Sequence, residues 1–236
     1  MAEPLLLIPS MMSDARVFSP QITEFSTERA VHIAAVTNCE TISEMAASVL
    51  KSAPENFALA GHGMGAVVAM DLLRTAPDRV SRIALISTNL QSETPADAAA
   101  REPQIVKVMG GRLEDVLKDV IKPECLAAGP IQAKVLALVQ AMGAHLGEGE
   151  FVRQTRAMQR RPDHQKTLRK IKIPALVLCG AQDSLTPPRR HQFMSEMIPY
   201  GSLCIIDDAG HFPTLESPKA TNDALRKWLD APLVLR

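Results

Sequence analysis

The chain has 236 residues, of which 46% are hydrophobic and 22% are charged, as is typical of one globular domain. Its 26 Lys and Arg residues balance 26 Asp and Glu residues, so no net charge favours nucleic acid or an anionic membrane as a partner. No apolar run approaches the length of a membrane span, and the N-terminal run PLLLI is too short for a signal peptide. The four cysteines lack the spacing of a metal site or a disulfide framework, which favours free thiols and a cytoplasmic location.

Six short apolar or β-branched runs are typical of strands that are buried on both faces of a parallel sheet. Helical patterns separate these runs. Thr41 and Glu44 have the spacing of a capping box, and Thr186-Pro187 resembles a cap residue followed by a first-turn proline. The alternation predicts an α/β fold with a mainly parallel six-stranded sheet flanked by helices. The predicted strands are Pro4–Ile8, Ala30–Val36, Asn56–Ala60, Arg82–Ser87, Ile173–Cys179 and Leu203–Ile206.

The interval from Asn89 to Lys170 interrupts this alternation. It contains several helical patterns and no good candidate strand, and glycines and prolines divide it into short pieces. We interpret it as a helical insertion that packs over the end of the sheet. The predicted organisation is a first part of the core in residues 1–90, a helical cap in residues 91–170, and a second part of the core in residues 171–236.

The glycine-rich sequence GHGMG lies where the third predicted strand gives way to a helix. Gly61, Gly63 and Ala66 fit the G-x-G-x-x-A loop of dinucleotide-binding proteins. That loop normally follows the first strand, however, and the acidic residue expected about twenty residues later is absent until Glu93. The same residues fit the G-x-S-x-G turn that presents the nucleophile of many hydrolases, with Gly63 in the place of serine. In such a turn the flanking residues must be small, and helix amides point at a developing oxyanion.

Two later loops contain the residues that would accompany such a nucleophile. Asp183 follows the fifth predicted strand and His211 follows the sixth. Nucleophile, acid and histidine occur in this order in α/β-hydrolases, and loops at the carboxyl ends of parallel strands converge on one crevice. We therefore expect Asp183 to orient His211, which acts as general base and then as general acid. Asp207 and Asp208 are alternative partners, although a structural role suits their position at a strand end better.

The sequence resembles small α/β-hydrolases, the bacterial esterases and lactonases grouped with pimeloyl-carrier methyl esterases. The matching segments are LLLIPSMMSDARVFSPQ, FALAGHGMGAVVAMDLLRTAPDRVSRIALIST, IKIPALVLCGAQDSLTPP and DDAGHFPTLE. They cover nearly all of the chain outside the insertion. The resemblance implies a core that lacks the first two strands of the family fold, with a helical cap between the fourth and fifth strands of this chain.

The resemblance also implies an oxyanion hole made of two backbone amides. One belongs to the residue after the nucleophile, here Met64, and the other to the loop after the first strand, here Met11. Relatives often have glycine where this chain has Ser10, whose hydroxyl would contact substrate or, more in keeping with its position, stabilise the turn. Family members commonly carry histidine at the position of His62, for which we expect a structural role.

Gly63 has two explanations. Glycine tolerates strained backbone angles, but a protein that had lost catalysis would have little reason to retain both Asp183 and His211. Our expectation is that serine is the native residue at position 63 and that this chain is an engineered inactive variant. The alternatives are a non-catalytic ligand-binding homologue with a natural glycine, and a lyase or cofactor-independent oxygenase that relies on the His–Asp pair.

The expected substrate is a small carboxylic ester or lactone. Methionine fills irregular space, so Met12, Met142 and Met158, together with Ser10, are candidate substrate-binding residues. A basic run that includes Arg156 and Arg160 would attract an anionic substrate or an acyl carrier protein, although such runs are usually solvated helix faces. We predict no metal and no cofactor. The sequence does not indicate an oligomeric state.

Overall fold

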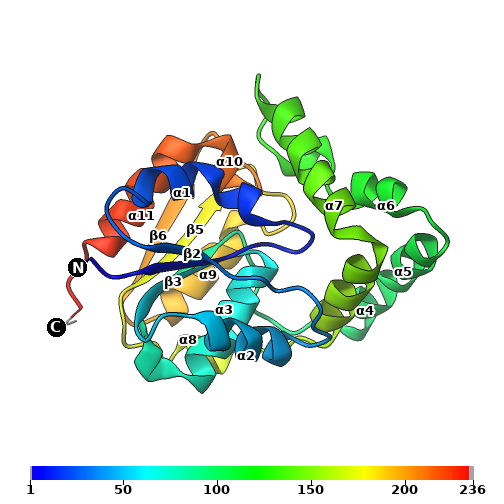
Figure 1. The fold of residues 1–236 in the computed structure, drawn as a ribbon. Helices are drawn as coiled ribbons and strands as arrows, with labels where there is room; N and C mark the ends of the chain where they lie inside the picture. Colours follow the sequence, from blue (N-terminus) through cyan, green and yellow to red (C-terminus); the bar gives the residue numbers. More distant parts are fainter. Residues whose placement is uncertain (1, 234–236) are drawn as a thin grey trace.

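All six predicted strands form, and they lie side by side in one sheet in the computed structural model, which describes residues 2–233. The order across the sheet is β2-β1-β3-β4-β5-β6, and every neighbouring pair is parallel. The prediction of an α/β fold with a six-stranded sheet is confirmed, and the sheet is wholly parallel (Figure 1). The strands are β1 (Leu5–Ile8), β2 (Val31–Ile33), β3 (Phe57–His62), β4 (Val80–Ile86), β5 (Ala175–Gly180) and β6 (Gly201–Ile206).

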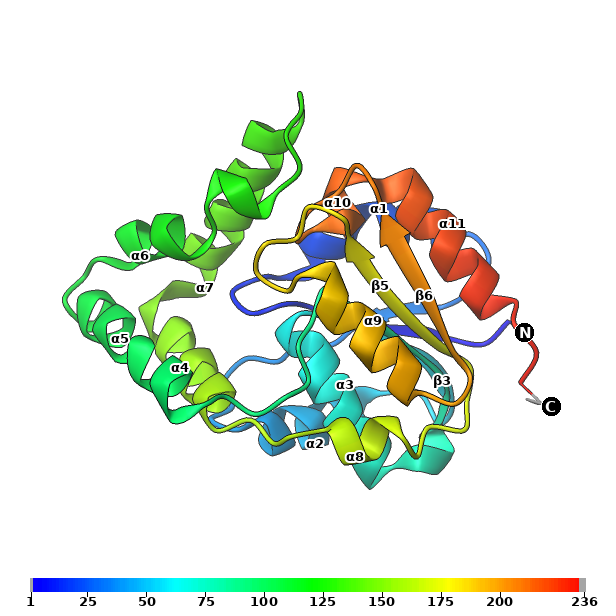
Figure 2. The same ribbon diagram turned by 180° about the vertical axis from the view of Figure 1, so that it is seen from behind.

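Helices cover both faces of the sheet, and β1, β3 and β5 are buried along their whole length. The prediction of burial on both faces is wrong for the edge strands β2 and β6, which are partly exposed because each has a neighbour on one side only. In β1, Leu6 and Ile8 belong to the buried cluster on one face, whereas Leu5 and Leu7 belong to the cluster on the other. Figures 1 and 2 show the two layers of helices. The first layer contains α2 (Ile42–Ser52), α3 (Met64–Thr75), α8 (Gln165–Leu168) and α9 (Pro188–Met197), and the second contains α1 (Ser19–Phe25), α10 (Pro213–Glu216) and α11 (Pro218–Leu229).

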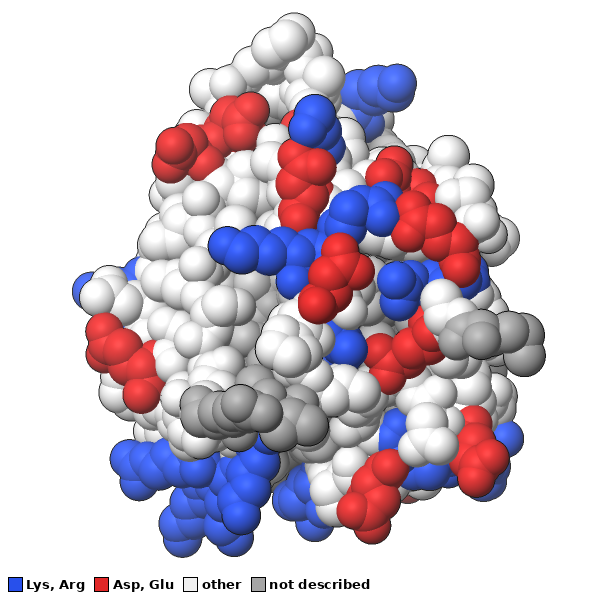
Figure 3. All heavy atoms as spheres, turned by 90° about the vertical axis from the view of Figure 1, so that its left-hand side faces the viewer, with Lys and Arg blue, Asp and Glu red and all other residues white. Residues whose placement is uncertain are grey.

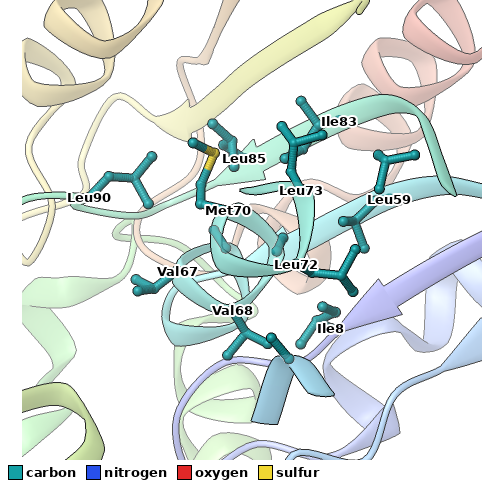
Figure 4. Packing of buried hydrophobic residues seen from close by; sticks show 14 of the residues in the cluster. Ile8, Leu59, Val67, Val68, Met70, Leu72, Leu73, Ile83, Leu85 and Leu90 are labelled. Carbon is teal, nitrogen blue, oxygen red and sulfur yellow. The ribbon is translucent and has the colours of Figure 1, made fainter. Parts of the chain in front are cut away.

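Helix α3 is the most deeply buried helix of the core. Every residue from Met64 to Leu73 is buried, because the helix lies between the sheet and α2. Its apolar side chains interdigitate with those of the central strands (Figure 4). This packing fixes the N-terminus of α3 against the ends of β1 and β3. The residues labelled in that view are Ile8, Leu59, Val67, Val68, Met70, Leu72, Leu73, Ile83, Leu85 and Leu90.

The segment between β4 and β5 is helical, and most of it projects beyond one end of the sheet (Figures 1 and 2). Its longest helix, α7, bends at Gly147, where the backbone φ of 83° leaves the helical region. The division of the chain after residues 90 and 170 stays a prediction. Before α8, the helices of this segment are α4 (Pro95–Ala100), α5 (Glu102–Met109), α6 (Leu113–Val120), the 3₁₀ turn η3 (Pro123–Cys125) and α7 (Gln132–Gln159).

Local sequence signals set several helix starts. The capping box at Thr41 and Glu44 is present, with reciprocal hydrogen bonds between side chain and backbone. The helix after Thr186 was predicted to begin at Pro187, and this is wrong by one residue, because α9 begins at Pro188. Thr186 does not cap this helix, since its hydroxyl and amide both donate to Asp183 instead.

Charges of both signs are intermixed on the side of the molecule turned away from α4–α7, apart from one group of basic side chains at its lower edge (Figure 3). This agrees with the equal numbers of basic and acidic residues in the sequence. Within the described residues, no helix combines the length and the apolar character that crossing a membrane requires.

Gly65, in the first turn of α3, allows the closest contact between a helix and the sheet. A Cβ atom at this position would lie less than 3.0 Å from the carbonyl oxygens of both Ile8 and Pro9. We expect Gly65→Ala to lower the free energy of unfolding by about 1–3 kcal/mol. The matched control is Gly129→Ala, since nothing lies within 4 Å of a Cβ there. Urea unfolding measures both variants, and equal midpoints would contradict the predicted close approach.

Candidate active site at the carboxyl ends of the strands

The loops that follow four of the strands bring the residues predicted for catalysis to one edge of the sheet. Ser10 follows β1, Gly63 follows β3, Asp183 follows β5 and His211 follows β6. All the strands are parallel, so these loops lie at the same edge. They border a pocket of about 540 Å³ whose lining includes Ser10, Gly63 and His211 as well as side chains from α4–α7.

Asp183 and His211 are in direct contact although they are far apart in the sequence. The His211 Nδ1 atom lies 2.9 Å from Oδ2 and 3.1 Å from Oδ1 of Asp183, so the imidazole donates to the carboxylate. Burial opposes the ionisation of Asp183, but its interactions with His211 and Thr186 outweigh burial and lower the pKa of Asp183 to about 2. The carboxylate is therefore ionised near neutral pH. Asp207 and Asp208 are both exposed, and His211 pairs with neither.

Thr186 completes the surroundings of Asp183, and the sequence analysis missed this contribution. Its hydroxyl donates to Asp183 Oδ2 at 2.6 Å and its amide donates to Oδ1 at 2.8 Å. The Leu185 amide donates to the same carboxylate at 3.0 Å. These bonds fix the carboxylate of Asp183 and leave it one side on which it accepts from the imidazole of His211. The signal in the sequence was the Asp-x-x-Thr spacing, which also fits a helix cap.

Gly63 occupies a sharp turn between β3 and α3. Its φ of 54° and ψ of −117° lie in a region that favours glycine and that a serine adopts only under strain. The turn is held from outside, since the Gly63 amide donates to the Ile86 carbonyl at 2.9 Å and the Thr88 hydroxyl donates to the Gly63 carbonyl at 2.8 Å. Gly61 and Gly65 flank it, and neither position has room for a Cβ.

The Ser10 side chain lies beside this turn. A Cβ atom at position 63 would come within 3.0 Å of Ser10 Oγ and would lie 3.3 Å from Ser10 Cβ. A serine at position 63 therefore fits only if the Ser10 hydroxyl rotates away. Ser10 is buried and lines the pocket, as predicted for a residue near the substrate, but its hydroxyl does not stabilise the turn by any hydrogen bond to residues 2–233.

The backbone amides of Met11 and Met64 lack an acceptor among the described residues. Both residues line the pocket beside Gly63. The next amide along the first loop, that of Met12, donates instead to Oε1 of Gln154 in α7 at 2.8 Å. Met12 has a φ of 53°, so this bond also holds a strained residue. Gln154 was missed by the sequence analysis because a polar residue inside a helix gives no signal of a distant partner.

Two buried histidines next to the site are held in neutral form. His62 Nε2 lies 2.8 Å from the His211 carbonyl oxygen, which only accepts, so Nε2 carries the proton. His191 Nε2 accepts from the Thr88 amide at 3.0 Å. Burial lowers the pKa of His62 to about 3 and that of His191 to about 4. His62 thus fixes the loop of His211, consistent with the structural role expected for it.

Glu216 also holds this loop. Its buried carboxylate accepts from the amides of Gly210 at 2.9 Å, Phe212 at 2.7 Å and Ala127 at 2.6 Å. The amide of His211 donates to the Cys125 carbonyl at 2.7 Å. The segment that precedes α7 and the histidine loop are therefore joined by one set of hydrogen bonds. Nothing in the local sequence indicates this connection.

The remaining pocket wall is partly as predicted. Met12 and Met158 line the pocket, whereas Met142 does not, because it is fully buried in the cluster that includes Val135 and Val139. It was selected as a methionine of the insertion, and residue type alone does not separate a pocket methionine from one in the core. Among the described residues, no group of three or more His, Cys, Asp or Glu side chains is arranged to hold a metal ion.

Three arginines near the C-terminal end of α7 pair with carboxylates, whereas Arg160 has no carboxylate partner among residues 2–233. Arg153 pairs with Glu150, Arg156 pairs with Glu102, and buried Arg161 pairs with Glu93 at 2.5 Å, as does Arg101 at 2.6 Å. Of these pairs, the one between Arg156 and Glu102 joins α7 to α5. Arg190, which also lies in the pocket wall, differs from these arginines in its partner.

Arg190 in α9 is half-buried and lines the pocket. Its Nη1 atom donates to Gln91 Oε1 at 2.9 Å, and within residues 2–233 it pairs with no carboxylate.

The neutral histidines predict an acid-sensitive fold. Below a pH of about 6.5 the unfolded chain protonates these side chains while the folded chain does not, so stability is complete above 6.5 and falls as the pH falls. On going from pH 7.5 to pH 5, each of these two histidines lowers the free energy of unfolding by about 2 kcal/mol. In the variant His191→Gln the amide oxygen can still accept from Thr88. Between pH 7.5 and pH 5 we expect its free energy of unfolding to fall by about 2 kcal/mol less than that of the unaltered chain. Urea unfolding at both pH values measures this loss, and an equal loss in both proteins would contradict the assignment.

Two known esterases are similar to this chain in sequence. Pimeloyl-[acyl-carrier protein] methyl ester esterase from Aromatoleum aromaticum is 26% identical over 76% of this chain and 76% of its own length. The enzyme of the same name from Aliivibrio salmonicida is 24% identical over 95% of this chain and 91% of its own.

Solved structures agree with the fold. A thermophilic esterase from Thermogutta terrifontis matches with a TM-score of 0.87 at 23% identity, over 97% of this chain and 90% of that one. An enol-lactonase from Burkholderia xenovorans matches with a TM-score of 0.85 at 20% identity, over 98% and 91%. The model of the "Alpha/beta hydrolase family" matches residues 13–224. The chain therefore belongs to the alpha/beta hydrolase family.

Proposed function

We propose that this protein is built to hydrolyse a carboxylic ester or a lactone. The observation that carries the proposal is the contact between His211 and ionised Asp183 at a pocket that also exposes two unpaired amides. A His–carboxylate pair accepts and returns one proton, and two amides stabilise one oxyanion. Acyl transfer to a hydroxyl needs this combination. The esterase relatives named above lend further support.

With a serine at position 63, the reaction would follow the usual course of a Ser-His-Asp triad. The hydroxyl would attack the acyl carbon and pass its proton to Nε2 of His211, while the Met11 and Met64 amides hold the oxyanion. His211 would protonate the departing alcohol and then activate water to release the acid. Glycine at position 63 removes this nucleophile, and such a loss typically lowers turnover by about six orders of magnitude. That serine is the native residue there stays a prediction.

For the substrate we propose a small ester or lactone with an anionic group. Arg190 supports this choice, since it is a pocket cation without a carboxylate partner in the described chain. Freedom from cofactors and a cytoplasmic location stay predictions from the sequence.

The first test gives the turn its missing hydroxyl. In the double variant Ser10→Gly, Gly63→Ser the nucleophile returns and the overlapping side chain is removed. We expect it to hydrolyse short p-nitrophenyl esters roughly 10³-fold faster or more than the same variant with His211→Ala added. Equal, background rates would contradict the proposed hydrolysis, and ligand binding without turnover would then favour a non-catalytic homologue.

The second test concerns the anionic group. We expect Arg190→Gln, made in the double variant, to raise the KM for an ester with a free carboxylate roughly three- to tenfold. The KM for a neutral ester of the same length should not change. Arg189→Gln is the matched control, because Arg189 is the exposed neighbour and does not line this pocket. If Arg190→Gln affected both esters alike, the side chain would have no role in recognising the charge.

A further inference from the structure

The Ser10 hydroxyl lies in the volume that a side chain at position 63 would occupy. The overlap involves Oγ itself, since an ideal Cβ at position 63 would be less than 3.0 Å from Ser10 Oγ. Ser10 is only 5% exposed, and it lines the same pocket as His211. Its hydroxyl makes no hydrogen bond with any residue from 2 to 233, His211 included, so no structural bond has to break when it turns toward Nε2 of His211 to react.

Ser10 and Gly63 are sterically matched to each other. Gly63 leaves the room that the Ser10 hydroxyl uses, and any side chain at position 63 would displace that hydroxyl. The resemblance to esterases implied the reverse arrangement, with glycine in the first loop and serine in the turn. In this chain the hydroxyl stands in the loop and the glycine in the turn, and the two share one small space.

We propose that Ser10 is the nucleophile of this chain as it stands. This inference rests on the proposed function and changes the source of the hydroxyl. A nucleophile at position 10 is followed directly by the amide of Met11, just as one at position 63 would be followed by that of Met64. Both amides are available for an oxyanion beside either position.

The reaction balances with the groups already described. Ser10 Oγ forms a bond to the acyl carbon and gives its proton to Nε2 of His211, while Asp183 stabilises the imidazolium. The bond from the acyl carbon to the alkoxy oxygen breaks as His211 returns the proton to the leaving alcohol. Water then attacks the acyl-Ser10 ester, again through His211, and the acid and the Ser10 hydroxyl are regenerated. No oxidant, reductant or metal takes part.

The loop that carries Ser10 is held rigidly enough for this role. The Ser10 carbonyl accepts from the Ser13 amide at 3.2 Å, and the Met12 amide donates to Gln154. Gln154 in turn donates to Oε1 of Glu150 at 3.0 Å, and the other oxygen of Glu150 accepts from the Asn38 amide at 3.1 Å. A chain of hydrogen bonds thus connects the loop to α7 and to the segment after β2.

The experiment is active-site labelling of the unaltered chain with a fluorophosphonate, followed by mass spectrometry of the peptides. We expect a phosphonyl group on Ser10, and no such label in Ser10→Ala or His211→Ala. Ser10→Ala should also lower kcat for short esters by about a hundredfold or more. The matched control is Ser13→Ala, which removes another buried serine of the same loop whose hydroxyl donates to the Met11 carbonyl. It should be labelled on Ser10 and keep its activity.

The outcomes separate this inference from the proposed function. If Ser10 stays unlabelled, or if Ser10→Ala retains full activity, Ser10 is not the nucleophile. Hydrolysis by the double variant Ser10→Gly, Gly63→Ser would in that case leave the proposed function standing. If neither the unaltered chain nor the double variant hydrolyses esters, the proposed function fails and this inference fails with it. Urea midpoints of Ser10→Ala and Ser13→Ala that match the unaltered chain exclude unfolding as the cause of any loss.

Discussion

The close approach of α3 to the ends of β1 and β3 is the constraint on which the site depends. Gly65 lies against the carbonyls of Ile8 and Pro9, and Gly61 lies against Gly65, so no side chain fits between these segments. The chain must therefore turn sharply at Gly63, with a positive φ. The same contact brings the first loop beside the turn, so that Ser10 and the amides of both segments border one space.

The neighbouring imidazoles lie in different electrostatic surroundings. His211 lies against a carboxylate that remains ionised, whereas His62 and His191 are buried without one and have lowered pKa values. The neutral pair acts through hydrogen bonds to backbone, His62 on the carbonyl of His211 and His191 on the amide of Thr88. Only one histidine at this edge is thus equipped to hold a proton during a reaction. The cost is stability in acid, because the buried imidazoles resist protonation.

The sequence was sufficient for the sheet because its strands are apolar on both faces and glycines or polar residues bound them. It also predicted that Asp183 and His211 lie together, since a parallel sheet brings the ends of its strands together whatever separates them in the chain. Local spacing was less informative where one pattern serves two purposes. Thr186 has the spacing of a helix cap and instead binds Asp183, and Met142 is of a residue type that suits a pocket wall and instead packs in the core.

Other features had no signal in the sequence at all. Gln154 and Glu216 are polar residues in helices, and their partners lie far away in the chain. Their roles depend on how α7 and the histidine loop meet the core, which is a property of tertiary packing. The relation between Ser10 and Gly63 is of the same kind. Each residue looks like a separate departure from the family pattern, and only their proximity shows that they occupy a common space.

A crystal structure of the protein with a bound phosphonate ester would test the central claim most directly. The account predicts a tetrahedral phosphorus at this edge of the sheet, bonded to Ser10 Oγ. One of its oxygens should accept from the amides of Met11 and Met64, and Nε2 of His211 should face the leaving group. A phosphonate bound elsewhere in the pocket, with both amides unoccupied and His211 turned away from it, would contradict the account.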